Sequence, residues 1–120
     1  MRVLVVDDDA GNRGLLADVL ADDGHEVAQA ADGAAALALL PDWQPDVILL
    51  DLLMPEMDGW DFLAAYQHRA PVILLTAAAV GPEGTIFGRP LPPVAGVLVK
   101  PFPLNDLFAA VRAAGAPGAL

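Results

Sequence analysis

The chain of 120 residues has the length of one domain, and its 56% of hydrophobic residues exclude a disordered tail. It has no cysteine, which excludes disulfide scaffolds and thiolate metal sites, and its apolar runs are too short to cross a membrane. The net charge of −10 argues against nucleic acid as a direct partner and favours cations. Since the N-terminal residues do not form a signal-peptide pattern, we expect a soluble, cytoplasmic protein that makes no membrane contact.

Short apolar runs that end in polar residues alternate with helical patterns along the chain. Strands are predicted at residues 2–6, 26–30, 47–50, 72–75 and 97–99. Four helices are predicted. The first contains Leu15 to Leu20 and ends at Gly24, and the second runs from Gly33 and ends at Pro41. The third spans residues 60–69 after an N-cap at Asp58, and the fourth contains Leu104 to Val111. Buried strands that alternate with helices predict an α/β fold with a parallel sheet and helices on both faces.

One segment interrupts this alternation. Residues 81–93 contain three glycines and four prolines where a parallel sheet would have a helix between its fourth and fifth strands. We therefore predict an irregular loop in place of that helix. Ile86 and Phe87 either fill the groove that the missing helix leaves or form an exposed apolar patch, and the sequence does not decide between the two. Residues 115–120 are predicted to be a frayed end or linker stub of a single domain spanning 1–120.

Polar side chains follow four of the predicted strands at their carboxyl ends. They are Asp7, Asp8 and Asp9 after the first strand, Asp51 after the third, Thr76 after the fourth and Lys100 after the fifth. Parallel strands bring their carboxyl ends to one edge, where ligands of such sheets bind. Clustered carboxylates without cysteine or a nearby histidine favour Mg²⁺, and Lys100 and Thr76 are suitable contacts for a phosphate. A carboxylate beside the metal can act as a nucleophile and become an aspartyl phosphate.

Four segments resemble the receiver domain of two-component response regulators. They are VLVVDDD at 3–9, DVILLDLLMPEMDG at 46–59, ILLTA at 73–77 and LVKPF at 98–102. The segments occur in the family's order, and the resemblance covers residues 1 to about 114. It implies a flavodoxin-like, doubly wound five-stranded parallel sheet in the order 2-1-3-4-5.

The resemblance also implies a role for each matching residue. Asp51 is the phosphoacceptor and a metal ligand, Asp8 binds Mg²⁺ directly, Asp7 binds it mostly through water, and the carbonyl of Leu53 is a further ligand. The phosphoryl group is contacted by the Thr76 hydroxyl, Lys100 and the Ala77 N–H. The peptide bond from Lys100 to Pro101 is cis. Asp9 is interpreted as a loop residue or helix cap instead of a metal ligand. Because Leu53 and Ala78 cannot hold an attacking water by a hydrogen bond, we predict a long-lived phosphoryl group.

The implied function is a switch that accepts a phosphoryl group from a histidine kinase or histidine phosphotransfer protein, with self-catalysed transfer and hydrolysis as its only chemistry. The expected partners are that donor and an unidentified output protein, with the chain a monomer or weak dimer. Two departures from the family, Val97 in place of an aromatic residue and the loss of the fourth helix, favour an alternative, a protein-interaction module that does not depend on phosphorylation. A Mg²⁺-dependent phosphatase or phosphotransferase is a third hypothesis, for which the sequence offers no second general acid–base residue.

Overall fold

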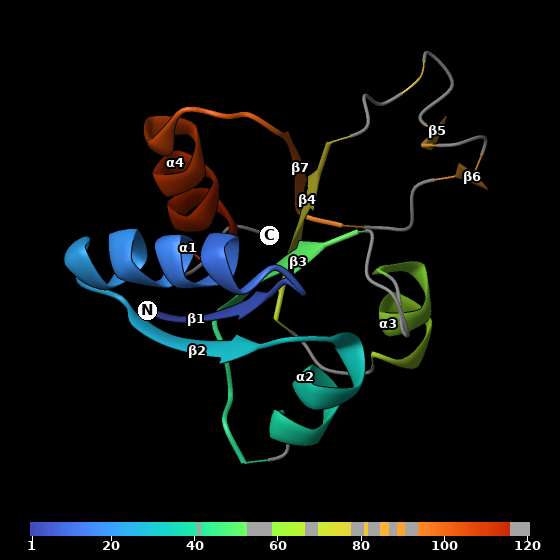
Figure 1. Cartoon of the computed structure of the whole chain (residues 1–120), viewed down its shortest axis with the longest axis horizontal. Helices are drawn as coiled ribbons and strands as arrows, with labels where there is room; N and C mark the ends of the chain where they lie inside the picture. The colour runs from blue at the N-terminus through green and yellow to red at the C-terminus, as the bar shows by residue number, and fades with distance from the viewer. Residues whose placement is uncertain are drawn as a thin grey trace.

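The computed structural model describes residues 1–40, 42–52, 59–66, 70–77, 81, 85–86, 89–90 and 94–115. Within them, one five-stranded parallel sheet has the order β2-β1-β3-β4-β7. Its strands are β1 (Arg2–Val6), β2 (Glu26–Ala30), β3 (Val47–Asp51), β4 (Val72–Thr76) and β7 (Gly96–Val99). This is the predicted order, and the flavodoxin-like α/β fold is confirmed (Figure 1).

Helices cover both faces of the sheet (Figure 1). On one face, α1 (Ala10–Asp22) and α4 (Leu104–Gly115) pack against a buried cluster that includes Val5, Leu49 and Leu75. On the other face, α2 (Gly33–Leu39) and α3 (Gly59–Ala65) pack against a cluster that includes Leu50 and Leu74. Alternate residues of each central strand therefore belong to different clusters, as the two-residue period of a strand requires. No helix in the described part of the chain is long and apolar enough to span a bilayer.

The central strands are buried on both faces, which explains their continuous apolar sequences. Every residue of β3 and β4 is buried, and β1 is buried from Val3 onward. The edge strand β7 is more accessible, with Val99 41% exposed. The register pairs Asp51 with Leu75 and Thr76 with Val99, so the carboxyl ends of β3, β4 and β7 lie side by side.

The helix boundaries agree with the capping signals in the sequence, with one correction. Asp9 and Asp32 accept hydrogen bonds as N-caps of α1 and α2, and Gly24 follows α1 with a φ of 92°. The helix predicted at 60–69 is observed at Gly59–Ala65. Beyond its end, the Tyr66 hydroxyl donates to the Ala70 carbonyl oxygen at 2.9 Å. Predictions at Pro41, at the Asp58 cap and at 67–69 fall outside the described residues.

The segment between β4 and β7 contains a feature that the sequence pattern did not predict. Its described residues include no helix, as expected, but β5 (Thr85–Ile86) and β6 (Arg89–Pro90) pair as a short antiparallel sheet (Figure 1). Ile86 is fully buried in the cluster beneath α2 and α3. Of the two roles left open for Ile86, the structure therefore shows core filling, while Phe87 lies outside the described residues.

Candidate functional site

The carboxyl edge of the sheet collects polar side chains from four strands. Asp7 follows β1, Asp51 ends β3, Thr76 ends β4 and Lys100 follows β7. Asp7 has no exposed area, Thr76 is 1% exposed and Asp51 is 9% exposed, which is low for polar residues. The Lys100 N–H donates to the Thr76 carbonyl oxygen at 2.7 Å, so the two strand ends are held together. The structure brings the side chains of Asp7, Asp51 and Lys100 together at this edge and places Thr76 at the end of the neighbouring strand β4.

Three carboxylates converge at this edge. Asp7, Asp8 and Asp51 each offer an oxygen, and these oxygens lie within 4.8 Å of one another. One Asp7 oxygen, Oδ1, accepts the Asp9 N–H at 2.9 Å, whereas Oδ2 is buried without a hydrogen-bond partner among the described residues. A buried carboxylate oxygen without a donor is costly, and clustered carboxylates repel one another. A divalent cation that prefers oxygen ligands would remove both costs, so the residues present fit Mg²⁺.

Lys100 contributes a positively charged ammonium group to the site. Its Nζ lies 3.7 Å from Asp7 Oδ2 and 3.8 Å from Asp51 Oδ2, which places a single positive charge beside both carboxylates. The side chain is 27% exposed, so the ammonium also remains accessible to a ligand that approaches from solvent. The peptide bond from Lys100 to Pro101 is cis, as the resemblance implied.

Arg13 is a site residue that the sequence reasoning missed. Its Nη1 donates to the main-chain carbonyl oxygen of Asp7 at 2.8 Å from the first turns of α1. It thereby holds the loop that carries the acidic residues and adds a positive charge near them. No sequence signal distinguishes this arginine from an exposed helix residue, because the contact depends on how α1 packs beside the end of β1.

Two further predicted residues lie in the described part of the chain. Ala77 is exposed and directly follows Thr76 at the end of β4. Asp9 caps α1 through a 3.0 Å hydrogen bond from the Asn12 N–H, as interpreted from the sequence. Leu53, the expected carbonyl ligand, lies outside the described residues.

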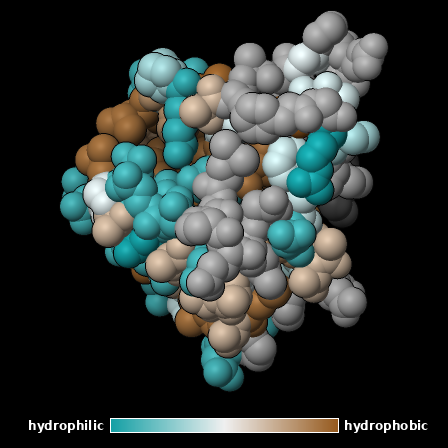
Figure 2. Space-filling model, turned by 45° about the vertical axis from the view of Figure 1, so that its right-hand side comes forward, coloured by the Kyte–Doolittle hydropathy of each residue, from teal (hydrophilic) through white to brown (hydrophobic). Residues whose placement is uncertain are grey.

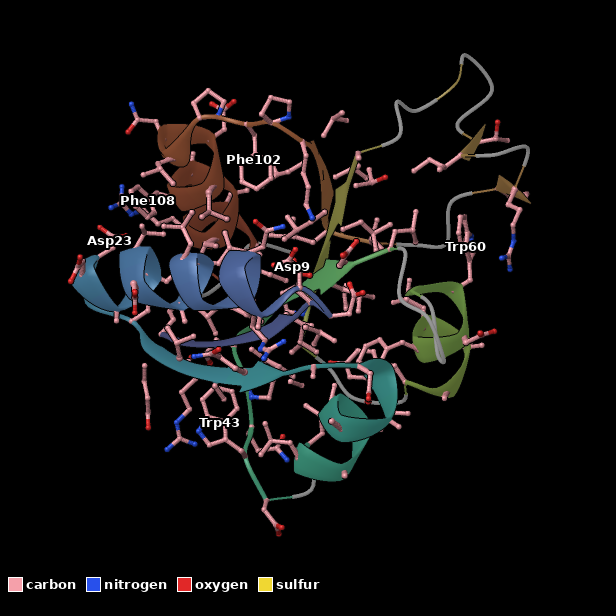
Figure 3. All side chains as sticks on the ribbon, viewed as in Figure 1. Asp9, Asp23, Trp43, Trp60, Phe102 and Phe108 are labelled. Atoms are coloured by element: carbon pink, nitrogen blue, oxygen red, sulfur yellow. The ribbon has the colours of Figure 1, made fainter. Side chains whose placement is uncertain are left out.

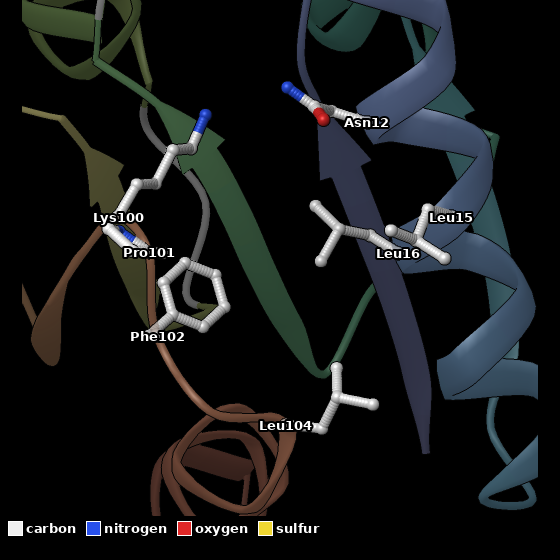
Figure 4. A pocket seen from close by; sticks show the side chains of 7 residues that line it. All are labelled: Asn12, Leu15, Leu16, Lys100, Pro101, Phe102 and Leu104. Atoms are coloured by element: carbon white, nitrogen blue, oxygen red, sulfur yellow. The ribbon is translucent and has the colours of Figure 1, made fainter.

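A groove of about 280 Å³ opens beside Lys100. It is lined by Asn12, Leu15, Leu16, Lys100, Pro101, Phe102 and Leu104. Lys100 and Asn12 lie at one end and Leu104 at the other (Figure 4). Leu15 is 61% exposed and Leu104 47% exposed, and hydrophobic surface lies between hydrophilic residues where α1 and α4 meet (Figure 2). The reactive edge is therefore continuous with an apolar surface.

The arrangement can carry out one type of chemistry. Asp51 offers a carboxylate oxygen next to the Lys100 ammonium, within a carboxylate cluster that fits a divalent cation. The ammonium and a bound cation would together neutralise negative charge that enters this edge. Phosphoryl transfer needs this kind of positioning and charge neutralisation more than it needs a further covalent catalyst.

Comparisons with known proteins agree with this chemistry. A family model described as the response regulator receiver domain matches residues 3–112. The transcriptional regulatory protein TcrA of Mycobacterium tuberculosis is 35% identical over 94% of this chain and 45% of its own length. The transcriptional regulatory protein CpxR of Escherichia coli is 40% identical over 93% of this chain and 48% of its own length. The chain thus spans about half the length of these curated relatives.

Among solved structures, the chemotaxis protein CheY4 of Vibrio cholerae aligns with a TM-score of 0.76 and 34% identity. That alignment covers 94% of this chain and 97% of CheY4. The similarity therefore extends to a structure that consists of little more than the aligned domain.

Proposed function

The chain belongs to the response regulator receiver domain family, and from this membership we propose that Asp51 accepts a phosphoryl group from a histidine kinase or histidine phosphotransfer protein. Members of this family are signalling switches in two-component systems. The single observation that carries the proposal is the convergence of Asp51 with Asp7, Asp8 and Lys100 at the carboxyl edge of the sheet. We further propose that residues 1–120 form one receiver domain.

The proposed transfer step uses the side chains at this edge. A carboxylate oxygen of Asp51 attacks the phosphorus of the donor phosphohistidine, a P–O bond forms, and the P–N bond breaks. The bonding electrons go to the leaving ring nitrogen of the donor histidine, which takes up a proton from water. Lys100 lies 3.8 Å from Asp51 Oδ2 and is placed to neutralise an oxygen of the incoming group. Hydrolysis later breaks the P–O bond with water and returns the Asp51 carboxylate and inorganic phosphate.

Asp7, Asp8 and Asp51 would hold Mg²⁺, as the orphaned Asp7 oxygen and the all-oxygen donor set favour. When bound, Mg²⁺ supplies positive charge to the phosphoryl oxygens. The Thr76 hydroxyl and the Ala77 N–H would donate to the phosphoryl group once it is attached, in the roles that the family resemblance gives them. Leu53 would add its carbonyl to the metal ligands.

The apolar groove beside Lys100 favours a protein as the phosphoryl donor. It shares Lys100 with the reactive edge and exposes Leu15 and Leu104. A donor that places its phosphohistidine at Asp51 would cover this groove, and apolar side chains of the donor would be buried there. The proposal therefore includes Leu15 and Leu104 in the contact with the histidine kinase or phosphotransfer protein.

The alternative of an interaction module that does not depend on phosphorylation finds no support in the family model or the relatives. The proposed switch is tested by intact mass after incubation with a small acyl phosphate. We expect one added phosphoryl group that requires Mg²⁺ and is absent from Asp51→Asn. Well-folded protein that gains no mass would contradict the proposal, as would an equal gain in Asp51→Asn.

A further inference from the structure

Arg13 holds the loop between β1 and α1 at two points. Its main-chain N–H donates to the Asp9 carbonyl oxygen at 2.9 Å, at the start of α1. Its side chain reaches further back, and Nη1 donates to the Asp7 carbonyl oxygen at 2.8 Å. Asp8, one of the three carboxylates that converge at the edge of the sheet, lies between these two points. Arg13 therefore fixes the main chain on both sides of Asp8.

The direction of the Asp8 carboxylate depends on this main chain. Asp8 is exposed, and no hydrogen bond or ion pair joins its carboxylate to another residue in the described part of the chain. Asp7 differs, because it is fully buried and one of its oxygens accepts the Asp9 N–H. The peptide group is planar, so a bond that holds the Asp7 carbonyl also holds the nitrogen and Cα of Asp8. The side-chain bond of Arg13 thus acts on the one carboxylate of the cluster that packing leaves free to turn.

We propose that Arg13 is a positioning residue of the cation site and strengthens Mg²⁺ binding by keeping Asp8 directed toward Asp7 and Asp51. This inference rests on the proposed function, because it concerns the same site. Arg13 does not touch the cation and acts only through the Asp7 carbonyl. A carboxylate that is already held within 4.8 Å of its partners loses less conformational freedom when the cation binds. Without the guanidinium bond, the peptide between Asp7 and Asp8 turns more freely, and the cation has to order it.

The positive charge of Arg13 has the opposite effect on Mg²⁺ binding. Like charges repel, so a guanidinium near the cluster lowers the affinity for a divalent cation. If charge were its only contribution, removal of the guanidinium would strengthen Mg²⁺ binding. If Arg13 only stabilised the fold, its removal would leave the affinity of the folded chain unchanged. Only positioning predicts weaker Mg²⁺ binding after a positive charge has been removed.

Isothermal titration calorimetry of the full chain with magnesium chloride measures this affinity. Arg13→Met removes the guanidinium and keeps a long side chain that favours a helix, while the main-chain bond to Asp9 is retained. We expect the dissociation constant for Mg²⁺ to rise by about three- to tenfold, at or below the effect of removing a group that bonds to a metal ligand itself. Arg13→Lys should restore most of the affinity, because the contact is a single hydrogen bond that an ammonium can also donate.

Arg112 provides the matched control. Its Nη2 donates to Asp23 Oδ1 at 3.1 Å, and Asp23 follows the last turn of α1. Figure 3 shows Asp9 and Asp23 at opposite ends of this helix, which has 13 residues. A helix of that length spans about 20 Å. Arg112→Met therefore removes the same charge without a change at the acidic loop, and it should leave the dissociation constant for Mg²⁺ unchanged.

The outcomes separate this inference from the proposed function. Equal or tighter Mg²⁺ binding by Arg13→Met would overturn the inference, because the guanidinium would then contribute only charge or stability. A loss of affinity that Arg112→Met shares, or that Arg13→Lys does not reduce, would also overturn it. If wild-type protein binds Mg²⁺ but gains no mass with acetyl phosphate, the proposed function is rejected instead. Circular dichroism establishes that each variant is folded, and Arg13→Gln, which is neutral and shorter, carries the same expectation if Arg13→Met does not fold.

Discussion

Lys100 Nζ lies 3.7 Å from Oδ2 of Asp7, a buried carboxylate oxygen that has no hydrogen-bond partner among the described residues. The distance is that of an ion pair without a direct hydrogen bond. Asp7 Oδ2 is therefore stabilised by charge alone, whereas Oδ1 accepts the Asp9 N–H, and the carboxylate lies in a cluster with two others. Such an arrangement is costly to the fold and favourable to a cation, because a cation in the site supplies the missing interactions. The stability of this chain should consequently depend on what occupies the site.

Mg²⁺ should raise the melting temperature. A ligand that binds only the folded chain adds about 1.4 kcal/mol at ten times its dissociation constant, which shifts the midpoint of a domain of this size by roughly 3–6 °C. Asp8→Asn removes one carboxylate of the cluster and should abolish most of the shift. It should also raise the melting temperature of the metal-free chain, because the remaining carboxylates repel less. Differential scanning calorimetry with and without millimolar Mg²⁺ measures both effects. An unchanged wild-type transition would mean that the acidic residues do not form a cation site.

Lys100→Met should destabilise the metal-free chain more than the Mg²⁺-bound chain. The substitution leaves the buried Asp7 carboxylate without its counter-charge, at a cost of about 1–3 kcal/mol given that Lys100 is partly exposed. Bound Mg²⁺ would again neutralise the Asp7 carboxylate, so the loss of unfolding free energy should be smaller when the cation is present. Urea unfolding of both proteins in each condition gives the four free energies. Equal losses in the two conditions would show that the cation and Lys100 act on different groups.

Gly59 and Gly14 form a matched pair of glycine substitutions. A Cβ at Gly59 would lie 2.9 Å from Leu52 Cα and 3.1 Å from its carbonyl oxygen, so Gly59→Ala should destabilise by about 1–3 kcal/mol. Gly14 lies inside α1 with no atom within 4 Å of an added Cβ, so Gly14→Ala should stabilise by about 0.5–1 kcal/mol. Thermal unfolding compares the two. Similar effects of the same sign would contradict the close approach of Gly59 to Leu52.

Leu15→Asp should separate protein donors from small donors. Leu15 lines the groove beside Lys100 and is 61% exposed, so an aspartate there would place a charge in the proposed donor contact. Transfer from a histidine kinase that phosphorylates the wild type should slow by about tenfold or more, while phosphorylation by acetyl phosphate changes by less than about twofold. Ala21→Asp, also exposed on α1 but not part of the groove lining, controls for the added charge. Equal transfer rates for the two variants would exclude the groove from the donor contact.

The lifetime of the phosphoryl group gives a further test of the family roles. Leu53 and Ala78 both lie outside the described residues, and neither side chain can orient an attacking water by a hydrogen bond. The wild-type phosphoryl group should therefore be long-lived. Leu53→Asn supplies an amide that can hold water and should accelerate loss of the group by severalfold. Decay of the added mass after donor removal measures this. Slower or unchanged decay in Leu53→Asn would count against the assigned role of this position.

The sequence was sufficient to predict the sheet, and it identified the polar residues that follow the strands at the carboxyl edge. Runs such as VILLD and VILLT could only be strands buried on both faces, and the polar residue at the end of each run marked the carboxyl edge. Asp9 and Gly24 carried local capping signals that depend on backbone geometry alone. These features were predictable because each is determined by a few consecutive residues or by strand period.

Other features depend on contacts between distant segments, and the sequence did not predict them. The pairing of Thr85–Ile86 with Arg89–Pro90 is too short to produce an alternating pattern, and the glycine- and proline-rich segment was expected to be an irregular loop. The contacts of Trp60 with Arg89 and of Arg13 with the Asp7 carbonyl join residues whose proximity arises only from packing. The end of α3 at Ala65 was not predicted, because the residue types that follow it in the sequence are compatible with a longer helix.

The central claim is that Asp51 carries the phosphoryl group, and borohydride reduction of the phosphorylated chain tests it most directly. An acyl phosphate on an aspartate is reduced to homoserine, which peptide mass spectrometry locates in the sequence. We predict homoserine at position 51, dependent on Mg²⁺ during phosphorylation. Homoserine at position 7 or 8 with none at position 51 would contradict the account, because the nucleophile would then be one of the residues assigned to the cation.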